Sequence, residues 1–374
     1  MKKKIIQVLF VALGVLAFNL ISCLPKSNQH STLIPPHPVA QGVSAPFAGF
    51  IDQWMVVGGG CNFPNIPAAD GGKKAYYSTF YACNTTADSL KWDLQTNFRL
   101  PIAYGASVET EKGLICIGGM NNQSSLSDVF RIEINHEKNG LNIHSLPSLP
   151  ESIDNAAATY LDGKLYVTGG NQGNEGNSLY TLCLDTDTTW SKLADYPGAK
   201  RVQPVLLASD NKLFLMGGFQ VDPITKKAII SADFITYNIQ ENSWSIPQPI
   251  PSMLNGEQRA LVGCAGTRVG DQLFIAGGVN YRIFKDAVEG KAPKDYMKRP
   301  SEWYQFSKDL LIYDLKTGTW SVIPEVDGFN KAGGTLLHHN KSLFMVCGEI
   351  KPGIRTSEIV KKEISTLLPK SNIK

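Results

Sequence analysis

The chain has 374 residues, of which 43% are apolar and 18% charged, as expected for a protein that folds around a packed core. The net charge is +3, and three of the positive charges lie in the first four residues, so the remainder is close to neutral and we predict no binding to nucleic acid. Chains of this length usually form two or three domains of about 150 residues, unless they are built from repeats.

The N-terminus has the layout of an export signal. Three lysines precede residues 5–22, an apolar stretch, and a small serine precedes Cys23 as in the lipobox of bacterial lipoproteins. We therefore expect residues 1–22 to be a signal peptide, Cys23 to be lipidated and the polar residues 23–30 to form a tether. The expected location is the bacterial periplasm, or the outer membrane for an anchored lipoprotein, with a lipid anchor as the only membrane contact. An uncleaved anchor helix is the alternative.

An apolar run that ends in two glycines recurs along the chain. The copies are WMVVGG (54–59), LICIGG (114–119), LYVTGG (165–170), LFLMGG (213–218), LFIAGG (273–278) and LFMVCG (343–348). In the sixth copy Cys347 replaces the first glycine. The intervals are close to the period of about 50 residues found in kelch propellers. Glycine pairs allow positive φ and close backbone approach near the crowded axis.

Each repeat continues with the same pattern of strands. A small-residue strand precedes the glycine run, and a strand with Tyr or Phe follows it. Four repeats then have a tryptophan strand, containing Trp92, Trp190, Trp244 and Trp320. A tryptophan on an outer strand packs one sheet against the next. Four strands in each of six units predict an all-β, six-bladed kelch-type β-propeller over residues 31–367.

The sixth unit is short near the C-terminus, so another segment must complete its sheet. Residues 31–36 (STLIPP) read as the missing outer strand, and we predict that they close the last blade. Residues 364–369 (ISTLLP) are the alternative.

Two sets of loops are expected on one face of the propeller. In an up-and-down meander, the loops between the second and third strands emerge beside the loops that connect one blade to the next. The first set carries Asn62, Asn121, Asn171, Gln172, Gln220, Asn280 and, in the sixth blade, Glu349. The second carries Arg99, Tyr104, Asp154, Asn155, Arg201, Gln203, Glu257, Arg259 and Lys331. A mouth of amides, arginines and one carboxylate is predicted, although amides after a glycine pair also cap turns.

Long insertions grow from the same face. Blade 5 has an aromatic and charged loop over residues 280–308, and shorter insertions occupy residues 61–74 and 221–227. Long ordered loops in compact domains are usually functional. A surface for docking another protein is the alternative.

No motif indicates a metal or a cofactor. His338 and His339 are adjacent, but neighbours in a strand point to opposite faces. The cysteines other than Cys23 are scattered without a CxxC pair, which indicates neither zinc nor a disulfide framework. Zinc-protease, P-loop, Rossmann and serine-hydrolase signatures are also missing. We predict no metal and no cofactor.

Several segments resemble the N-acetylneuraminate epimerases, also called sialate mutarotases. They are GEIKPGIRT (348–356), AGGVNYRIF (276–284), FSKDLLIYDLKTGTWS (306–321), GGGCNFP (58–64), LPIAYGASV (100–108) and the pair Arg201 and Gln203. The first of these is the most specific. The segments stand in rotated order, as in the branch described as cyclically permuted mutarotases.

The resemblance implies an isomerase that interconverts the α and β anomers of N-acetylneuraminate, with Glu349 as general acid/base and Arg355 as its charged partner. It also implies binding roles for Arg201, Asn280 and Asn62, to which we add the mouth residues Gln203, Arg99 and Tyr104. Opening a cyclic hemiketal requires one proton to be removed and one to be delivered, which a single carboxylate can do. An acidic sugar also calls for arginine. A structural ion pair between Glu349 and Arg355 is the alternative.

Three other functions remain open. A surface lipoprotein of this fold could bind glycans or proteins without converting them. It could act on another sugar. The third alternative, a copper oxidase of the galactose-oxidase kind, needs His and Tyr ligands, and the chain has only six histidines.

Overall fold

Six antiparallel sheets follow one another along residues 34–173 and 176–368, which are the residues that this computed structural model describes. The predicted signal peptide, Cys23 and the tether lie outside them. From the inside outward, blade 1 consists of β1 (Phe47–Ile51), β2 (Trp54–Gly58), β5 (Thr79–Asn84) and β6 (Trp92–Asn97). Blade 2 consists of β7 (Ala106–Thr110), β8 (Gly113–Ile117), β9 (Val129–Asn135) and β10 (Gly140–Ser145). Blade 3 consists of β11 (Ala157–Leu161), β12 (Lys164–Thr168), β13 (Leu179–Cys183) and β14 (Ser191–Lys192).

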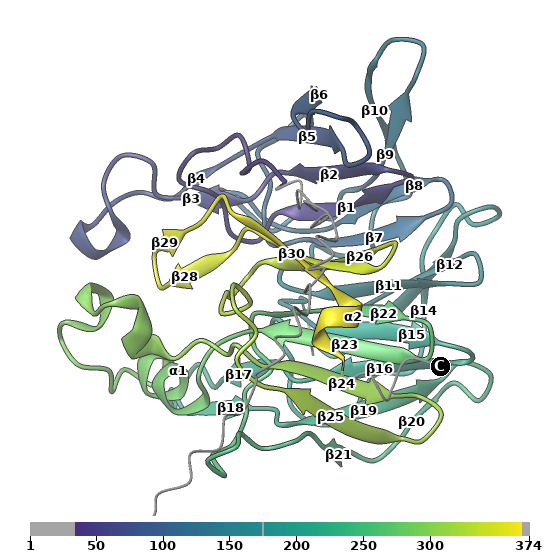
Figure 1. Ribbon diagram of the computed structural model, residues 1–374. Coiled ribbons are helices and arrows are strands. Elements are labelled where there is room, and N and C mark those ends of the chain that lie inside the picture. The colour runs from purple at the N-terminus through teal and green to yellow at the C-terminus, as the bar shows by residue number, and fades with distance from the viewer. Residues whose placement is uncertain (1–33, 174–175, 369–374) are drawn as a thin grey trace, which may run out of the picture. The chain divides into compact units, whose positions relative to one another are not determined.

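Blades 4 to 6 repeat this order (Figure 1). Blade 4 consists of β15 (Val205–Ser209), β16 (Lys212–Met216), β19 (Asp233–Asn238) and β20 (Ser243–Trp244), with β21 (Gln248–Pro249) also paired to β19. Blade 5 consists of β22 (Cys264–Val269), β23 (Gln272–Gly277), β24 (Leu310–Asp314) and β25 (Thr319–Ile323). Blade 6 consists of β26 (Thr335–His339), β27 (Ser342–Val346) and β30 (Ile359–Glu363). The chain is therefore a six-bladed β-propeller, as predicted.

The inner strands close a ring around the axis. Contacts run from β1 to β7, β11, β15, β22 and β26, and from β26 back to β1. The second strands are the apolar runs of the repeat, and β8 and β27 are buried along their whole length. Each hydrophobic cluster is shared between neighbouring blades; Phe47 and Phe80 of blade 1, for example, pack with Phe130 of blade 2. Burial between blades thus holds the ring together.

The glycine pairs have the conformation that the repeat predicts, although in blade 1 the left-handed pair is Gly59 and Gly60, since Gly58 still belongs to β2. Gly277 and Gly278 have φ values of 75° and 93°, and a side chain at Gly277 would begin 2.4 Å from the carbonyl oxygen of Lys331. No side chain fits there, because the contact is with backbone. In blade 6 Cys347 takes the same left-handed conformation, with φ 53°, at the position where the sequence departs from the repeat.

The tryptophans lie at the outer strands and fasten neighbouring blades, as predicted. Trp190 Nε1 donates to the carbonyl of Pro147, and Trp244 Nε1 donates to the carbonyl of Ala194, each on the linker that leaves the preceding blade. Trp92 of blade 1 donates in the same way to Pro36. Pro36 therefore occupies the position of a linker that leaves blade 6.

The predicted closure of blade 6 is only partly within the described residues. Residues 34–36 form no strand, although Ile34 packs with Phe344 and Ile359, and residues 31–33 lie outside the described part. The N-terminal closure thus remains a prediction for those residues. The alternative closer is wrong in its described part, because residues 364–367 form the helix α2 (Ile364–Leu367) instead of a strand.

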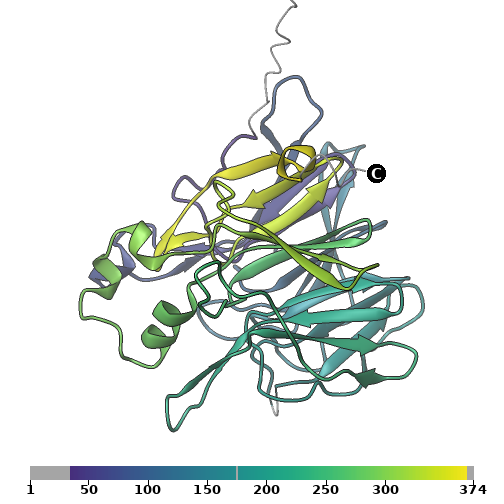
Figure 2. The same ribbon diagram turned by 60° about the horizontal axis from the view of Figure 1, so that its bottom comes forward.

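Four blades carry structured insertions between their second and third strands. Blade 1 has β3 (Cys61–Asn62), η1 (Ala68–Asp70) and β4 (Ala75–Tyr76); blade 4 has β17 (Phe219–Val221) and β18 (Ala228–Ile230); blade 5 has α1 (Tyr281–Val288), η2 (Tyr296–Lys298) and η3 (Ser301–Tyr304); and blade 6 has β28 (Glu349–Lys351) and β29 (Ile354–Arg355). Both ribbon views show them projecting from the same side of the sheets (Figures 1 and 2). No helix in the described part is long and apolar enough to cross a membrane.

Candidate active site

A cavity of about 470 Å³ lies at the mouth on this side of the propeller. Its walls include the residues that precede the inner strands and the insertion of blade 5. Of the eight residues with a predicted catalytic or binding role, four line it: Tyr104, Gln203, Asn280 and Glu349. The predicted mouth residue Asn155 lines it as well. A cavity of this size, with a few polar groups among apolar ones, is typical of a small-molecule site.

Six residues, one just before each inner strand, form the floor of the mouth, and we call them the mouth ring. All have left-handed backbone, with φ between 52° and 65°: Ala45, Tyr104, Asn155, Gln203, Gly263 and Gly333. Backbone hydrogen bonds of 2.6 to 3.1 Å join five of the six neighbouring pairs, the exception in the described residues being Gln203 and Gly263. The ring therefore presents large polar side chains from blades 2 to 4 and leaves space at blades 5, 6 and 1.

Glu349 and Arg355 face each other across the hairpin β28–β29. They are register partners, and Arg355 Nη2 lies 2.6 Å from Glu349 Oε1. The turn between them contains Gly353 with φ 82°, which favours glycine. The side chain of Arg355 is 3% exposed and that of Glu349 is 24% exposed. Only the carboxylate lines the cavity, with the guanidinium behind it.

The environment of Glu349 suits an acid/base. Burial raises the pKa of its carboxyl group, whereas the charges of Arg355 and Lys74 and a backbone hydrogen bond from Gly353 oppose this by lowering it. The net shift is upward from the ordinary value. A raised pKa makes the carboxylate a stronger proton acceptor, as a general base requires.

Tyr104 is the second polar group on the cavity wall. Its hydroxyl oxygen accepts a hydrogen bond of 2.9 Å from Lys74 Nζ and lies 3.3 Å from Cys61 Sγ. Burial, followed by the charge of Cys61, raises the pKa of Tyr104. The phenol therefore keeps its proton and can donate a hydrogen bond to a bound molecule.

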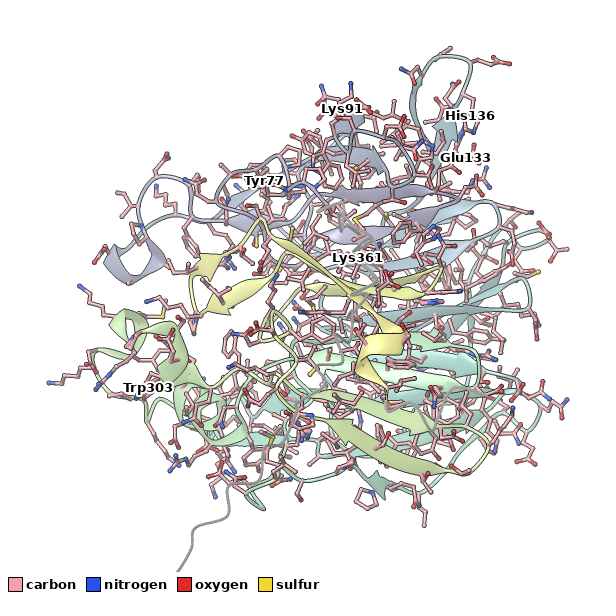
Figure 3. The ribbon with its side chains drawn as sticks, viewed as in Figure 1. Tyr77, Lys91, Glu133, His136, Trp303 and Lys361 are labelled. Carbon is pink, nitrogen blue, oxygen red and sulfur yellow. The ribbon has the colours of Figure 1, made fainter. Side chains whose placement is uncertain are left out.

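The insertions of blades 4, 5, 6 and 1 contact one another, and we call them the wall. Phe219 of β17 packs edge-on against Phe284 of α1, with ring centres 5.0 Å apart. Lys351 of β28 donates a 2.7 Å hydrogen bond to the carbonyl of Arg299, and η1 contacts η2. Figure 3 labels Trp303, which lies within the blade 5 part of the wall at the left of the molecule. Blades 2 and 3 contribute no such hairpin or helix in the described residues.

Asn280 has a double function at the start of the wall. It caps α1, its side-chain oxygen accepting from the backbone N–H of Ile283 at 3.0 Å, and its amide nitrogen lies 3.3 Å from Gln305 Oε1. It also lines the cavity. Its proximity to the cavity agrees with the predicted binding role, and its capping bonds show that it also builds the wall.

Three predicted binding residues do not line the cavity. Arg201 is buried and pairs with Asp233 at 2.7 Å. Asn62 is buried, with its amide bonded to a backbone carbonyl and to a tyrosine hydroxyl. Arg99 pairs with Asp128 and has a side chain that is 63% exposed. Each polar group is held by a structural partner, so direct contact with a bound molecule is not supported for these residues.

Lys74 is the site residue that sequence reasoning missed. It stands at the end of an insertion that was expected to be functional, beside Lys73, and no motif distinguishes the two. Only the hairpin β3–β4 brings it to Tyr104 and close enough to Glu349 to lower that pKa. In the described residues no group of three or more His, Cys, Asp or Glu side chains could hold a metal ion.

Comparisons with known proteins agree with the site. Residues 146–368, more than half of the chain, match the family model described as N-acetylneuraminate epimerase. The N-acetylneuraminate epimerase of Haemophilus influenzae (strain PittEE) is 33% identical over 231 residues, covering 58% of this chain and 59% of that protein. That of Salmonella typhi is 28% identical over 230 residues, covering 58% of each chain. This chain thus aligns with less than two thirds of the length of these relatives.

A solved structure, "Structure of YjhT", has the same fold. It superposes with a TM-score of 0.62 at 18% identity and covers 89% of this chain and 98% of that one. Its coverage extends beyond the part that the family model matches. From the match over blades 3 to 6, the chain belongs to the N-acetylneuraminate epimerase family.

Proposed function

We propose that this protein is an isomerase that interconverts the α and β anomers of N-acetylneuraminate without a cofactor. The observation that carries the proposal is the pair of Glu349 and Arg355 at the cavity, with the carboxylate accessible and its pKa raised. Family membership and the names of the relatives support the choice of sugar.

The proposed reaction needs only proton transfers. Glu349 removes the proton of the anomeric hydroxyl, and as the bond between the anomeric carbon and the ring oxygen breaks, the protonated Glu349 delivers that proton to the ring oxygen. The open-chain keto acid turns about the bond beside its carbonyl and closes from the opposite face by the reverse steps. Glu349 returns its proton, so the enzyme ends unchanged. General acid/base catalysis of this kind contributes roughly 10²- to 10⁴-fold.

The charges around the cavity suit an acidic sugar. Glu349 contributes one negative charge, whereas Arg355 and Lys74 contribute two positive ones, and both cations are close enough to affect its pKa. Around Glu349 these charges are net positive, which favours a substrate carboxylate beside the anomeric carbon on this side of the cavity. Arg355 is buried behind Glu349, so it acts through its charge and by holding the carboxylate in place.

The test is the rate of anomer conversion. Freshly released α-N-acetylneuraminate is followed by NMR with buffer, wild type and Glu349→Gln, and with Glu137→Gln, an exposed glutamate, as the control. We expect acceleration by the wild type and the control and a loss of roughly 10²-fold or more in Glu349→Gln. Equal rates with and without protein would refute the proposal. Binding without acceleration would make the protein a glycan-binding module instead.

We also propose that blades 1 and 2 correspond to the last blades of the relatives, as in cyclically permuted mutarotases. The family model matches blades 3 to 6 and leaves residues 34–145 unmatched, although the fold neighbour covers 89% of the chain. If residues 34–145 are moved behind residue 368, the alignment to the relatives should extend over nearly the whole propeller. An alignment that still ends at the same residues would contradict this.

The N-terminal residues support a further proposal about location. We propose export to the periplasm and lipid attachment at Cys23, because a basic segment, an apolar stretch and a small residue precede this cysteine. Metabolic labelling with a radioactive fatty acid should mark the wild type and not Cys23→Ala. Equal labelling of both would place the lipid elsewhere, and no labelling of either would rule out lipidation.

A further inference from the structure

A buried carboxylate lies at the mouth on the side away from the wall. Asp154, on the linker that enters β11, is 3% exposed. One carboxylate oxygen accepts hydrogen bonds of 2.7 Å from the side-chain amides of Asn155 and Asn171, and the other accepts from the hydroxyl of Ser125. In the described part of the chain no lysine, arginine or histidine pairs with it. The side chains that donate hydrogen bonds to Asp154 are therefore all uncharged.

This carboxylate fixes the orientation of the neighbouring amides. The oxygen and nitrogen of an amide are usually hard to tell apart, but both oxygens of Asp154 act as acceptors here. Asn155 must therefore turn its nitrogen to Asp154 and its oxygen away. That oxygen accepts a 3.0 Å hydrogen bond from Gln203 Nε2. The direction of donation thus runs from Gln203 through Asn155 to Asp154.

The end of this chain of hydrogen bonds is a free acceptor at the cavity. With Nε2 of Gln203 held by Asn155, its Oε1 faces the other way, where a side chain at Gly263 would begin only 3.5 Å from it. No described residue donates a hydrogen bond to Oε1. Gln203, Asn155 and Gly263 all line the cavity.

The backbone holds the same arrangement. Asn155 and Gln203 are neighbours in the mouth ring, and the backbone N–H of Gln203 donates to the carbonyl of Asn155 at 2.9 Å. A group fixed through both its backbone and its side chain loses little freedom when a ligand binds. It therefore favours a ligand that complements it.

We propose that Asp154 is a positioning residue, which acts through Asn155 to hold Oε1 of Gln203 toward the cavity. There Oε1 is a hydrogen-bond acceptor that selects a sugar with a hydroxyl or N–H donor at the matching position. The identity of the sugar rests on the proposed function, whereas the orientation of the amides does not. A sugar without that donor would leave a fixed acceptor unpaired, which corresponds to a loss of affinity of roughly tenfold.

The first test needs no ligand. The side-chain amide signals of Asn155 and Gln203 are followed by NMR in ¹⁵N-labelled protein. Asp154→Leu should move both signals and speed their hydrogen exchange. Asp154→Asn should largely preserve them, because its oxygen can still accept from both asparagines. Ser125→Ala, which leaves that oxygen untouched, is the matched control. Unchanged Gln203 signals in a folded Asp154→Leu protein would overturn the proposal.

A second variant covers the case in which Asp154→Leu does not fold. Asn155→Gly removes the relay and keeps a residue that accepts the left-handed φ of 53° without strain. It should change the Gln203 signal as Asp154→Leu does. A folded Asn155→Gly protein with the wild-type Gln203 signal would equally overturn the proposal.

The second test measures selectivity. Dissociation constants are determined by NMR for N-acetylneuraminate and for analogues in which one hydroxyl or the acetamido group is replaced by hydrogen. One analogue should bind the wild type about tenfold more weakly than the parent. This difference should disappear in Gln203→Met, Asn155→Gly and Asp154→Leu and persist in Asp154→Asn and Ser125→Ala. Discrimination that survives in Asp154→Leu but not in Gln203→Met would show that no relay operates.

The two proposals fail in different ways. A wild type that binds none of these sugars refutes the proposed function but leaves the ligand-free amide signals as a test of the relay. A wild type that binds and converts the parent sugar but discriminates against no analogue refutes the selecting role alone.

Discussion

The wall and the open side of the mouth contribute different chemistry to one cavity. The wall places charged groups there: the accessible carboxylate of Glu349, the guanidinium of Arg355 behind it and the ammonium group of Lys74. The open side, at blades 2 and 3, places neutral donors and acceptors on the mouth ring, with the carboxylate of Asp154 buried beneath them. Extra hairpins can carry long charged side chains inward, whereas the ring positions are fixed by their backbone and suit short polar ones.

The largest effect is expected from breaking the ion pair of the wall. Arg355→Met should reduce conversion at neutral pH by about 10²-fold, because Glu349 loses the partner that holds its carboxylate in place and the charge that lowers its pKa. Arg355→Lys should retain part of the activity. The predicted loss of stability is modest, about 2 kcal/mol, since Nε and Nη1 of Arg355 are already buried without partners. Activity that is unchanged in Arg355→Met would remove the pair from the mechanism.

A smaller effect is expected from the second cation of the wall. The charge of Lys74 lowers the pKa of Glu349, so Lys74→Met should raise that pKa. If Glu349 acts as a base, the acidic limb of the pH–rate profile should then move to higher pH. Lys73→Met, which changes the exposed neighbour, should leave the profile in place. Identical profiles for the two variants would contradict the charge effect.

On the open side, blade 2 contains a carboxyl group with a raised pKa, that of Glu109, and we expect this group to affect stability instead of activity. Burial raises the pKa of Glu109 on β7 to about 7, against the effect of a hydrogen bond from the backbone of Phe50. Because this pKa lies above the ordinary value of 4.5, the folded state holds more protons between the two values. The stability due to this group is therefore present below about pH 4.5 and falls as the pH rises through 7.

The corresponding experiment is a melting series from pH 5 to pH 8. Glu109→Gln should lower the pH dependence of the melting temperature, while Glu137→Gln should not. We expect only a partial effect, since the side chain of Glu109 keeps contact with solvent. If Glu109→Gln melts with the full wild-type pH dependence, its carboxyl group does not titrate in this range.

The smallest effect is expected from loosening the wall at one contact. Glu289, at the end of α1, accepts a 2.9 Å hydrogen bond from the backbone N–H of Ala228 in β18. Glu289→Ala should raise KM by less than about fivefold and leave kcat unchanged, because it touches no reacting group. Arg282→Ala, on the exposed side of the same helix, is the control. A drop in kcat would mean that the wall also positions catalytic groups.

The fold could be predicted because the repeat encodes it locally. Each glycine pair needs left-handed backbone at the end of a buried strand, and the pattern is readable wherever that need recurs. The position of Glu349 at the cavity could be predicted for the same reason, because it differs from the amides at equivalent positions of the repeat. Closure of blade 6 was harder, because the residues that would complete a sheet carry no repeat signature.

The predicted binding residues that do not line the cavity, and the one that sequence reasoning missed, have a common physical explanation. Arg201 and Arg99 were assigned to the mouth by their positions, but a charged side chain is directed by its partner, and Asp233 and Asp128 lie on other strands. Lys74 was missed for the converse reason, because its contact with Tyr104 joins two loops that are distant in sequence. Sequence position identifies the face of the molecule, but the ion pairs decide which side chains reach the cavity.

The mouth ring makes the propeller a convenient scaffold for changing specificity. Each blade contributes one mouth-ring position, and backbone hydrogen bonds to the neighbouring positions hold most of these residues in place. A side chain can therefore be exchanged there without remodelling a loop. Two of these positions, Gly263 and Gly333, have no side chain. Asparagine and aspartate tolerate the left-handed conformation better than most residues. Variants with asparagine or aspartate at these two positions would form a small set of proteins with the same catalytic residues and different sugar-binding sites.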